Sequence, residues 1–401
     1  MRTERVVPGA RAPASRRGDG RRAGHLLIEL LRPGGPRSCT EVSADDVREA
    51  AALAFRHGLF LQVDRTIREH AGSFPAGLVA GGYEAAMGPL RLEHVSHALR
   101  YERLEREVLS LLEAAAVPSV ILKGSALSRD LFGDPHTRTS ADIDLLVRPA
   151  AVPAADAALR QAGYRRDNDR PLGFWMRRLH HAVYQRPGSR VPVEIHWNFS
   201  IPGFFNLSPE EIWAGVDLDG LSGRLNPAMN LTLLLMHHHL HGCADLRTLV
   251  DLVWALDRHR EELDPGRWPE HLEAAGLLVA AGIARLQAEA LWGLQLSDIG
   301  GSRRGQGLRV RLLAKAAVSA LRPGRQPRAS DRYLHALIHR LGLDAPRRVI
   351  WSFAKTLLPS AADVRALNGS GRGGLSGRVR YLLWRSGVQA AGDRGKGGPR
   401  A

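Results

Sequence analysis

Two acidic residues, separated by one position in an otherwise apolar stretch, give the strongest chemical signal in the chain. Asp142 and Asp144 alternate with Ile143 and Leu145 in the run DIDLLV. Because alternate residues of a β-strand point to the same side, this spacing predicts two carboxylates on one face and apolar side chains on the other. Paired carboxylates repel each other and are costly to bury unless a cation lies between them. Mg²⁺ suits such a pair, because it takes one or two carboxylates together with substrate phosphates.

A segment upstream of these acids has the composition of an anion-binding turn. Residues 120–122 are an apolar run that predicts a buried strand, and residues 126–132 have helical composition. Gly124 and Ser125 would therefore lie at a helix N-terminus, where free backbone N–H groups and the helix dipole attract phosphate. Glycine allows a close approach and serine adds a hydroxyl group. Lys123, one of only four lysines in the chain, precedes this turn, although its position could be due to chance.

A later stretch repeats the alternation of acidic and apolar residues. In the run VPVEIHW, Glu194 and His196 share one face of the expected strand, and the apolar residues share the other. The linker RPGSR at 186–190 predicts a hairpin turn that joins this strand to a short strand at 182–185. Glu194 is a candidate third carboxylate, and the alternative is a surface acid on an edge strand. For His196 we expect a side chain satisfied by its neighbours or facing a substrate.

The order of these parts resembles the signature of the nucleotidyltransferase superfamily, whose fold is seen in the palm of DNA polymerase β. With a lysine before Gly124, and with Phe132-Gly-Asp-Pro and Arg138 before the paired acids, the chain is similar to the family of uncharacterised bacterial nucleotidyltransferases. The block 237–254, a histidine-rich helix and then a leucine-patterned helix containing Asp251, resembles the same family. Two departures are a gap before Asp142 that is longer than in the smallest superfamily members, and Glu194 where many members have aspartate.

The resemblance implies a Mg²⁺-dependent enzyme that moves a nucleoside monophosphate from a nucleoside triphosphate, with ATP as first candidate, to an acceptor, releasing pyrophosphate. We expect a hydroxyl-type acceptor on a small molecule, peptide or protein. The catalytic and metal-binding residues would be Asp142, Asp144 and Glu194, with two Mg²⁺ ions, or Mn²⁺ in their place. The nucleotide-binding residues would be Lys123, Gly124, Ser125 and Arg138.

Two other function classes were weighed against this one. The first is a catalytically degenerate module with the same fold that binds nucleic acid or a protein partner. An intact set of three carboxylates disfavours it. The second is a kinase that transfers the γ-phosphate, which would use similar metal ligands. The chain lacks the HRD, DFG and Walker motifs of the known kinase and ATPase classes.

The charge of the chain is concentrated at its ends. The formal net charge is +15 over 401 residues. Residues 1–40 carry +6 of it, from nine Arg against three acids. Residues 366–401 carry another +6, from seven Lys and Arg against one Asp. The body of the protein is therefore nearly neutral, and nucleic acid would be bound, if at all, through the tails. Two cysteines, no signal peptide and no apolar run of about 18 residues favour a cytoplasmic protein without a membrane span.

The pattern of helices and strands predicts an α+β protein. Its centre would be a nucleotidyltransferase core with a small mixed sheet, flanked by an N-terminal helical segment and a larger all-α C-terminal region. We expect a basic, largely disordered segment at 1–40, helices at 41–115, the core at 116–225, a helical domain at 226–365 and a Gly/Arg-rich tail at 366–401.

Two further clusters have competing interpretations. His237 and His241 are four positions apart on an expected helix, a spacing that can chelate Zn²⁺, but no acid is placed as a third ligand. We therefore expect these histidines to line a cleft or to form internal hydrogen bonds. The aromatic pairs at 174–175 and 204–205 could stack on a base, but packing in the core is the expected role.

Overall fold

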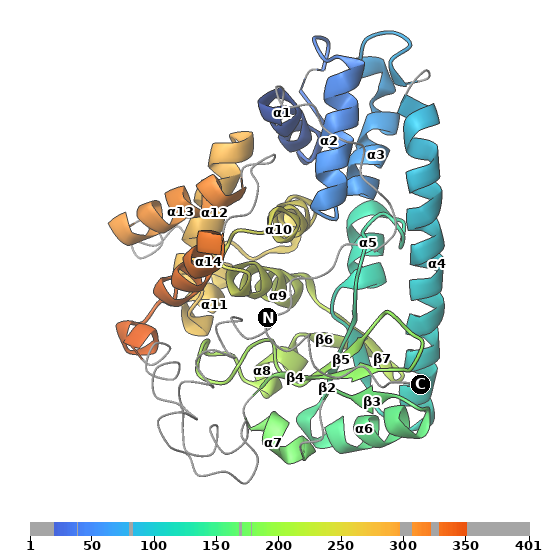
Figure 1. The fold of residues 1–401 in the computed structure, drawn as a ribbon. Coiled ribbons are helices and arrows are strands. Elements are labelled where there is room, and N and C mark those ends of the chain that lie inside the picture. Colours follow the sequence, from blue (N-terminus) through green and yellow to red (C-terminus); the bar gives the residue numbers. More distant parts are fainter. Residues whose placement is uncertain are drawn as a thin grey trace, which may run out of the picture.

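The computed structural model describes residues 20–37, 39–79, 83–167, 171–177, 179–296, 307–321 and 329–350. A mixed β-sheet lies in the lower half of the view in Figure 1, and helices lie above it, below it and along one side. The chain therefore combines helices and strands as the sequence predicts. The tails predicted to be basic lie mostly outside the described residues.

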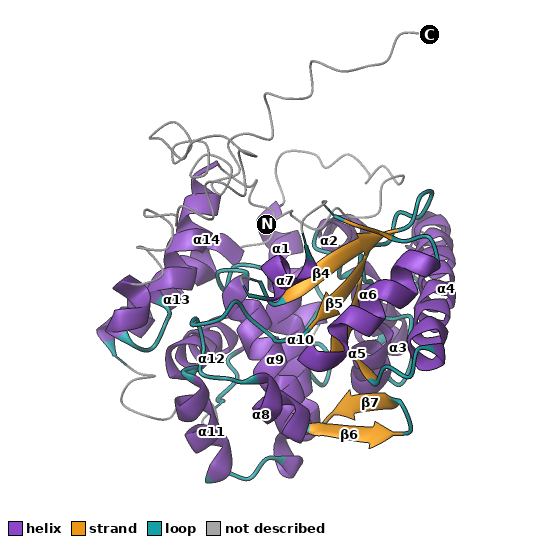
Figure 2. Cartoon of the chain, turned by 90° about the horizontal axis from the view of Figure 1, so that it is seen from below, coloured by secondary structure: helices purple, strands orange, loops and turns teal. Residues whose placement is uncertain are grey.

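The sheet has seven strands in the order β3-β4-β5-β2-β1-β7-β6. The pairs β2–β5 and β1–β7 are parallel, and the other neighbours are antiparallel. Figure 2 shows β6 and β7 together at one end of the sheet. The strands are β1 (Ser119–Ile121), β2 (Ile143–Val147), β3 (Arg165–Arg166), β4 (His181–Gln185), β5 (Val193–His196), β6 (Val216–Asp219) and β7 (Ser222–Leu225).

The hairpin of β6 and β7 was not predicted. Its turn contains Asp219-Gly220, and Gly220 has a φ of 61°. Asp-Gly between two short strands is a strong signal for a tight hairpin, because glycine adopts positive φ without a steric penalty. The sequence therefore carries a signal for this hairpin in the Asp219-Gly220 pair.

Four α-helices precede the sheet in the part of the chain that the structure describes, and the fourth runs along one side of the molecule from the other three to the sheet (Figure 1). The second begins with a capping box: the Ser43 side chain accepts from the Asp46 backbone N–H, and the Asp46 side chain accepts from the Ser43 N–H. The helices are α1 (Gly20–Leu30), α2 (Ala44–Arg56), α3 (Phe60–Glu69) and α4 (Glu84–Ala114).

Helix α1 corrects the expectation that residues 1–40 are largely disordered. Leu27 and Leu30 of this helix are fully buried in the main hydrophobic cluster. The low hydrophobicity of the whole segment concealed a short amphipathic stretch, whose leucines recur at helical spacing and pack against α2 and α3. Residues 1–19 lie outside the described residues.

Four short helices connect the strands. Helix α6 ends at Gln161, and Gly163 follows its C-cap with a φ of +85°. Helix α8 starts with a second capping box, formed by Ser208 and Glu211. These helices are α5 (Gly124–Phe132), α6 (Val152–Gln161), α7 (Leu172–Met176) and α8 (Pro209–Ala214).

The described part of the chain after residue 226 is helical, as predicted. Helix α11 has proline at 269 in its first turn and is followed by glycine at 276. Residues 346–350, the last that the structure describes, are helical. The helices are α9 (Pro227–Leu240), α10 (Leu246–His259), α11 (Arg267–Ala275), α12 (Leu278–Trp292), α13 (Leu308–Leu321) and α14 (Ala329–Leu341).

The alternation of side chains separates the two faces of the central strands. Leu145 of β2 and Ile195 of β5 are fully buried in a cluster with residues of α4 and α6. Leu146 instead belongs to the larger cluster, which contains residues of α5, α9 and α10. Asp144 and Glu194 precede Leu145 and Ile195 by one position, so they project to the face that carries Leu146.

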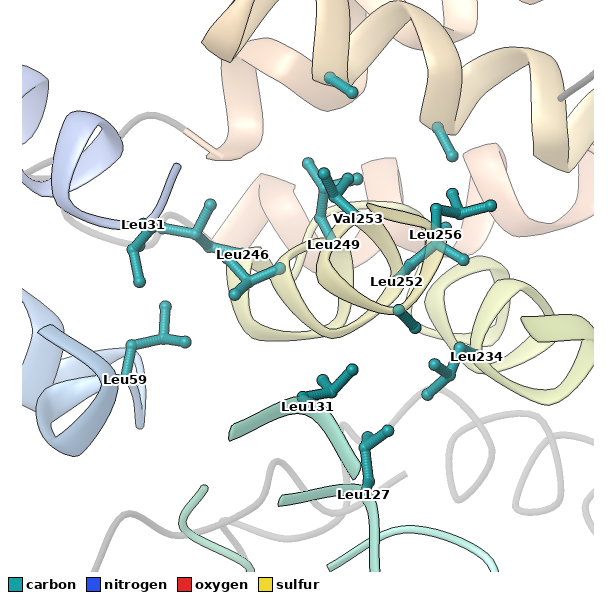
Figure 3. Close-up of a cluster of buried hydrophobic side chains, with 14 of the residues drawn as sticks. Leu31, Leu59, Leu127, Leu131, Leu234, Leu246, Leu249, Leu252, Val253 and Leu256 are labelled. Atoms are coloured by element: carbon teal, nitrogen blue, oxygen red, sulfur yellow. The ribbon is translucent and has the colours of Figure 1, made fainter. Parts of the chain in front are cut away.

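The larger cluster connects the sheet to helices from both ends of the chain. Figure 3 shows leucines of α5 and α9 around α10, with Leu31 and Leu59 from the N-terminal region beside them. Each fully buried leucine stabilises the fold by about 1.5–3 kcal/mol. This shared core fixes α5 and α9 relative to β2, and both helices border the candidate site described below.

Among the described residues, no single helix combines the length and hydropathy needed to cross a membrane. Helices α11 and α12 reach that threshold only together, and they are bent by 118° relative to each other. Both cysteines, Cys39 and Cys243, are buried and free.

Candidate functional site

Two of the three predicted carboxylates meet on one face of the sheet. Asp144 of β2 and Glu194 of β5 are directly paired in the parallel register of these strands. Together with His196 they form a group whose possible ligand atoms lie within 4.8 Å of one another. Asp144 is buried, whereas 21% of the Glu194 side chain is exposed, so the group is accessible from the side of Glu194. Two carboxylates and an imidazole at this distance have the chemistry of a divalent-cation site.

Asp142 lies immediately before β2 and takes a different position. Its backbone carbonyl accepts a hydrogen bond of 2.8 Å from the Tyr101 hydroxyl, and its carboxylate does not belong to the group formed by Asp144, Glu194 and His196. The pKa of Asp142 is raised to about 7, mainly because the carboxyl is buried and secondly because of the negative charge of Asp144. Asp142 therefore takes part in the electrostatics of the site and exchanges a proton near neutral pH.

Two basic groups compensate the charge of Asp144. Lys123 Nζ lies 3.0 Å from Asp144 Oδ2, and His196 Nε2 lies 2.9 Å from Asp144 Oδ1. Burial acts to raise the pKa of Asp144, but Lys123 and His196 outweigh it and hold this pKa well below its usual range. Burial likewise acts to lower the pKa of Lys123, but the charges of Asp144 and Asp142 prevail and raise it.

His196 bridges the two carboxylates. Besides its bond to Asp144, its Nε2 lies 3.3 Å from Glu194 Oε2. Burial opposes protonation of His196, yet its hydrogen bonds to Asp144 and Glu194 raise its pKa to about 9. Burial acts to raise the pKa of Glu194, and the hydrogen bond to His196 and the charge of His181 reverse this and lower it. At neutral pH the site thus holds two carboxylates, an ammonium and an imidazolium.

The predicted anion-binding turn is adjacent to this group. Helix α5 begins at Gly124, whose φ is +61°. A Cβ atom at this position would lie 2.5 Å from the Tyr101 hydroxyl oxygen, so both the conformation and the space require glycine. Ser125 is buried and its hydroxyl donates to Glu105, whose pKa is raised by burial. The serine hydroxyl is therefore already bonded, and the free N–H groups of the first turn are the donors available to an anion.

Arg138 is buried and bonded to other residues of the chain. Its Nε lies 3.0 Å and 3.1 Å from the two carboxylate oxygens of Asp251, and its Nη2 lies 2.9 Å from Asp251 Oδ2. Nη1 donates to Ser140 Oγ at 2.8 Å. The predicted phosphate ligand thus forms a two-pronged ion pair that joins the loop before β2 to α10, with 3% of the Arg138 side chain exposed.

The histidines of α9 divide between the core and the site. His238 bonds Thr248 and Gln287, and His239 bonds the His339 carbonyl, so these two form internal hydrogen bonds. Nε2 of His237 is buried and has no hydrogen-bond partner. Burial is the main cause that lowers the pKa of His237, and the positive charge of Lys123 is the second. Neither group of possible metal ligands found among the described residues includes His237 or His241.

The predicted aromatic pairs are part of the packing where they are described. Phe204 and Phe205 are buried in the main hydrophobic cluster. Trp175 is partly buried against the second cluster. The Phe174 side chain lies outside the description.

Several residues around the site were not predicted from the sequence. His180 and His181 lie beside His196, and Tyr101 and Glu105 of α4 contact the turn at Gly124 and Ser125. A signal for the histidines was present, because they open a strand predicted to pair with the strand of Glu194 and His196. For the α4 residues no local signal exists, since the contacts span about twenty positions or more.

The fold and the site together define a mixed α/β protein with a carboxylate and histidine group next to a helix N-terminus. A family model described as uncharacterised nucleotidyltransferase matches residues 43–293, which is more than half of the chain. The chain belongs to this family, and is therefore a transferase of phosphorus-containing groups that uses a nucleoside triphosphate donor. No curated protein and no solved structure matches the chain significantly.

Proposed function

We propose that the protein transfers a nucleoside monophosphate from a nucleoside triphosphate to a hydroxyl group on a small molecule, peptide or protein, and releases pyrophosphate. The observation that carries this proposal is the pairing of Asp144 with Glu194 on neighbouring parallel strands, next to the first turn of α5. The order of elements supports a core like the palm of DNA polymerase β. Free cysteines and the absence of a single spanning helix in the described chain agree with a cytoplasmic location.

Asp144 and Glu194 would hold Mg²⁺, and Asp142 would join them as a ligand of a second ion. The residues fit this group, because hard oxygen ligands from two carboxylates lie within reach of one another. Bound divalent ions would neutralise phosphate charge and orient the attacking and leaving oxygens. Lys123 and His196, which compensate Asp144 in the structure, balance the same negative charge that a cation would meet.

Glu194 is the proposed acceptor of the proton from the attacking hydroxyl. Its pKa is lowered, so it is ionised at neutral pH and can accept a proton. It is also the more exposed of the two paired carboxylates, and an acceptor molecule reaches it without disturbing β2.

The phosphates of the donor would lie against α5. The free N–H groups after Gly124 supply donors, and Lys123 supplies a positive charge 3.0 Å from Asp144. Ser125 and Arg138 are not proposed to contact the phosphates directly. The Ser125 hydroxyl is bonded to Glu105, and the Arg138 guanidinium is bonded to Asp251. We propose that Ser125 fixes the shape of the turn and that Arg138 fixes the loop before β2. ATP is the proposed donor, and comparing the four nucleoside triphosphates measures which base the protein prefers.

The test is incubation of the full chain with each of the four labelled nucleoside triphosphates, Mg²⁺ and a cell extract, followed by mass analysis of molecules that gain a nucleotide. We expect label transfer with wild type and a loss of at least about a hundredfold in Asp144→Asn, given that outer-shell changes alone cost 10–100-fold at metal sites. Asp217→Asn, on the exposed edge strand β6, is the matched control and should retain full transfer. Equal transfer by the Asp144 and Asp217 variants would show that the chemistry lies elsewhere.

A further inference from the structure

Three imidazole rings lie together beside the paired carboxylates. His180 directly precedes β4, His181 opens β4, and His196 ends β5, where the antiparallel register pairs it with His181. The possible ligand atoms of the three rings lie within 4.8 Å of one another. The ring centroids are 4.4 Å apart for His180 and His181, 4.9 Å for His181 and His196, and 5.7 Å for His180 and His196.

The contacts among these rings are those of ligands more than of a packed core. His180 Nε2 and His181 Nδ1 are 3.0 Å apart, close to the separation of about 3.4 Å that two nitrogens have on a tetrahedral ion with bonds of 2.0–2.1 Å. His180 Nδ1 is buried and has no hydrogen-bond partner. The cluster also has an approach from solvent, because 25% of the His181 side chain is exposed.

We propose that His180, His181 and His196 form a site for a transition-metal ion such as Zn²⁺. Neutral imidazole is a preferred ligand of zinc, whereas Mg²⁺ takes oxygen ligands, so this site differs in chemistry from the carboxylate pair. Three protein ligands leave a coordination position open. Glu194 Oε2 lies 3.3 Å from His196 Nε2 and 3.7 Å from His181 Nε2, so a carboxylate borders the proposed site.

The site would connect two strands at the entrance to the carboxylates. The antiparallel pair of β4 and β5 brings His181 opposite His196, while His180 lies in the preceding segment. Binding of the ion would displace the proton of His196, and the ion would then place a positive charge next to Glu194. The proposal does not depend on nucleotide transfer, because the ion is measured without nucleotide.

The test is titration of the chelator-treated full chain with Zn²⁺ in competition with a colorimetric chelator, and with Co²⁺ monitored by its visible absorption. Wild type should bind one Zn²⁺ per chain through this site. His180→Phe and His181→Gln should each weaken Zn²⁺ binding by at least about tenfold, the lower bound for disturbing even an outer-shell partner. His70→Gln, at the C-terminal end of α3, where His70 Nδ1 lies 3.1 Å from the Thr66 carbonyl oxygen, is the matched control and should bind Zn²⁺ like wild type.

Two results would overturn the proposal: unchanged Zn²⁺ affinity in both the His180 and His181 variants, or no Zn²⁺ binding by wild type at micromolar metal. Circular dichroism of each variant verifies that it is folded. Failure here is distinguishable from failure of the proposed function, since Zn²⁺ binding is measured without nucleotide and nucleotide transfer is measured by a separate assay.

Discussion

Replacing Asp251 should destabilise the protein strongly, because the change leaves Arg138 charged and buried without a partner. Three hydrogen bonds of 2.9–3.1 Å join the two side chains, of which only 3% and 1% are exposed. Removing one partner of a buried ion pair costs about 3–5 kcal/mol. For a chain of this size, at about 2 °C per kcal/mol, Asp251→Leu should lower Tm by about 6–10 °C.

The assay is thermal and urea unfolding of Asp251→Leu, Arg138→Met and the double variant. If the pair acts structurally, the double variant should recover most of the lost stability, since well-packed apolar residues replace buried pairs at little cost. The exposed pair of Arg48 and Asp45 is the control: Asp45→Asn should change stability by less than about 1 kcal/mol.

A small effect in Asp251→Leu would refute this reasoning. If that variant lost less than about 1 kcal/mol, or if Arg138→Met kept its stability and lost only affinity for nucleotide, Arg138 would be a phosphate ligand after all. Its role would then be the one that its position before the paired acids first predicted.

Three further changes test the surroundings of the site. Gly124→Ala should weaken nucleotide binding, because the added Cβ would lie 2.5 Å from the Tyr101 hydroxyl oxygen. The control is Gly133→Ala, a position with a similar φ of +70° and open space around it, which should show only the backbone strain. Equal nucleotide affinities in the two variants would contradict this role of Gly124. Burial lowers the pKa of His94 to about 4, so stability is intact above pH 6.5 and falls as the pH drops from 6.5 towards 4, by up to about 1.4 kcal/mol per pH unit. His94→Phe should flatten this fall in urea unfolding at pH 7.5 and 5.0, and an unchanged slope would exclude His94 as its source. His237→Gln should raise the KM for ATP, since the buried Nε2 of His237 has no partner and Lys123, the proposed phosphate contact, is the charged group that affects His237 most; an unchanged KM for ATP would place His237 outside the donor site.

The sequence was most informative where a short-range pattern determines the geometry. Alternation in the strand after Asp142 predicted that Asp144 turns away from the core face of Leu145, and the same rule placed Glu194 opposite Ile195. The apolar run and the Gly-Ser pair predicted a helix that begins at Gly124. These features depend only on neighbours a few residues apart, so local periodicity suffices.

The remaining features depend on contacts between distant residues. Arg138 and Asp251 are 113 positions apart, and nothing local indicates that this arginine pairs with α10 instead of facing a phosphate. The position of Asp142 outside the ligand group follows from the strand starting one residue later, at Ile143, together with its contact to Tyr101. A sequence pattern gives the face of a strand but not its exact start.

The most direct measurement of the central claim is Mn²⁺ binding by electron paramagnetic resonance in the presence of ATP, compared among wild type, Asp144→Asn, Glu194→Gln and Asp217→Asn. If Asp144 and Glu194 share a divalent cation across β2 and β5, both site variants should lose most of the bound Mn²⁺ and the Asp217 variant should bind like wild type. Mn²⁺ binding that is the same in all four proteins would contradict the account.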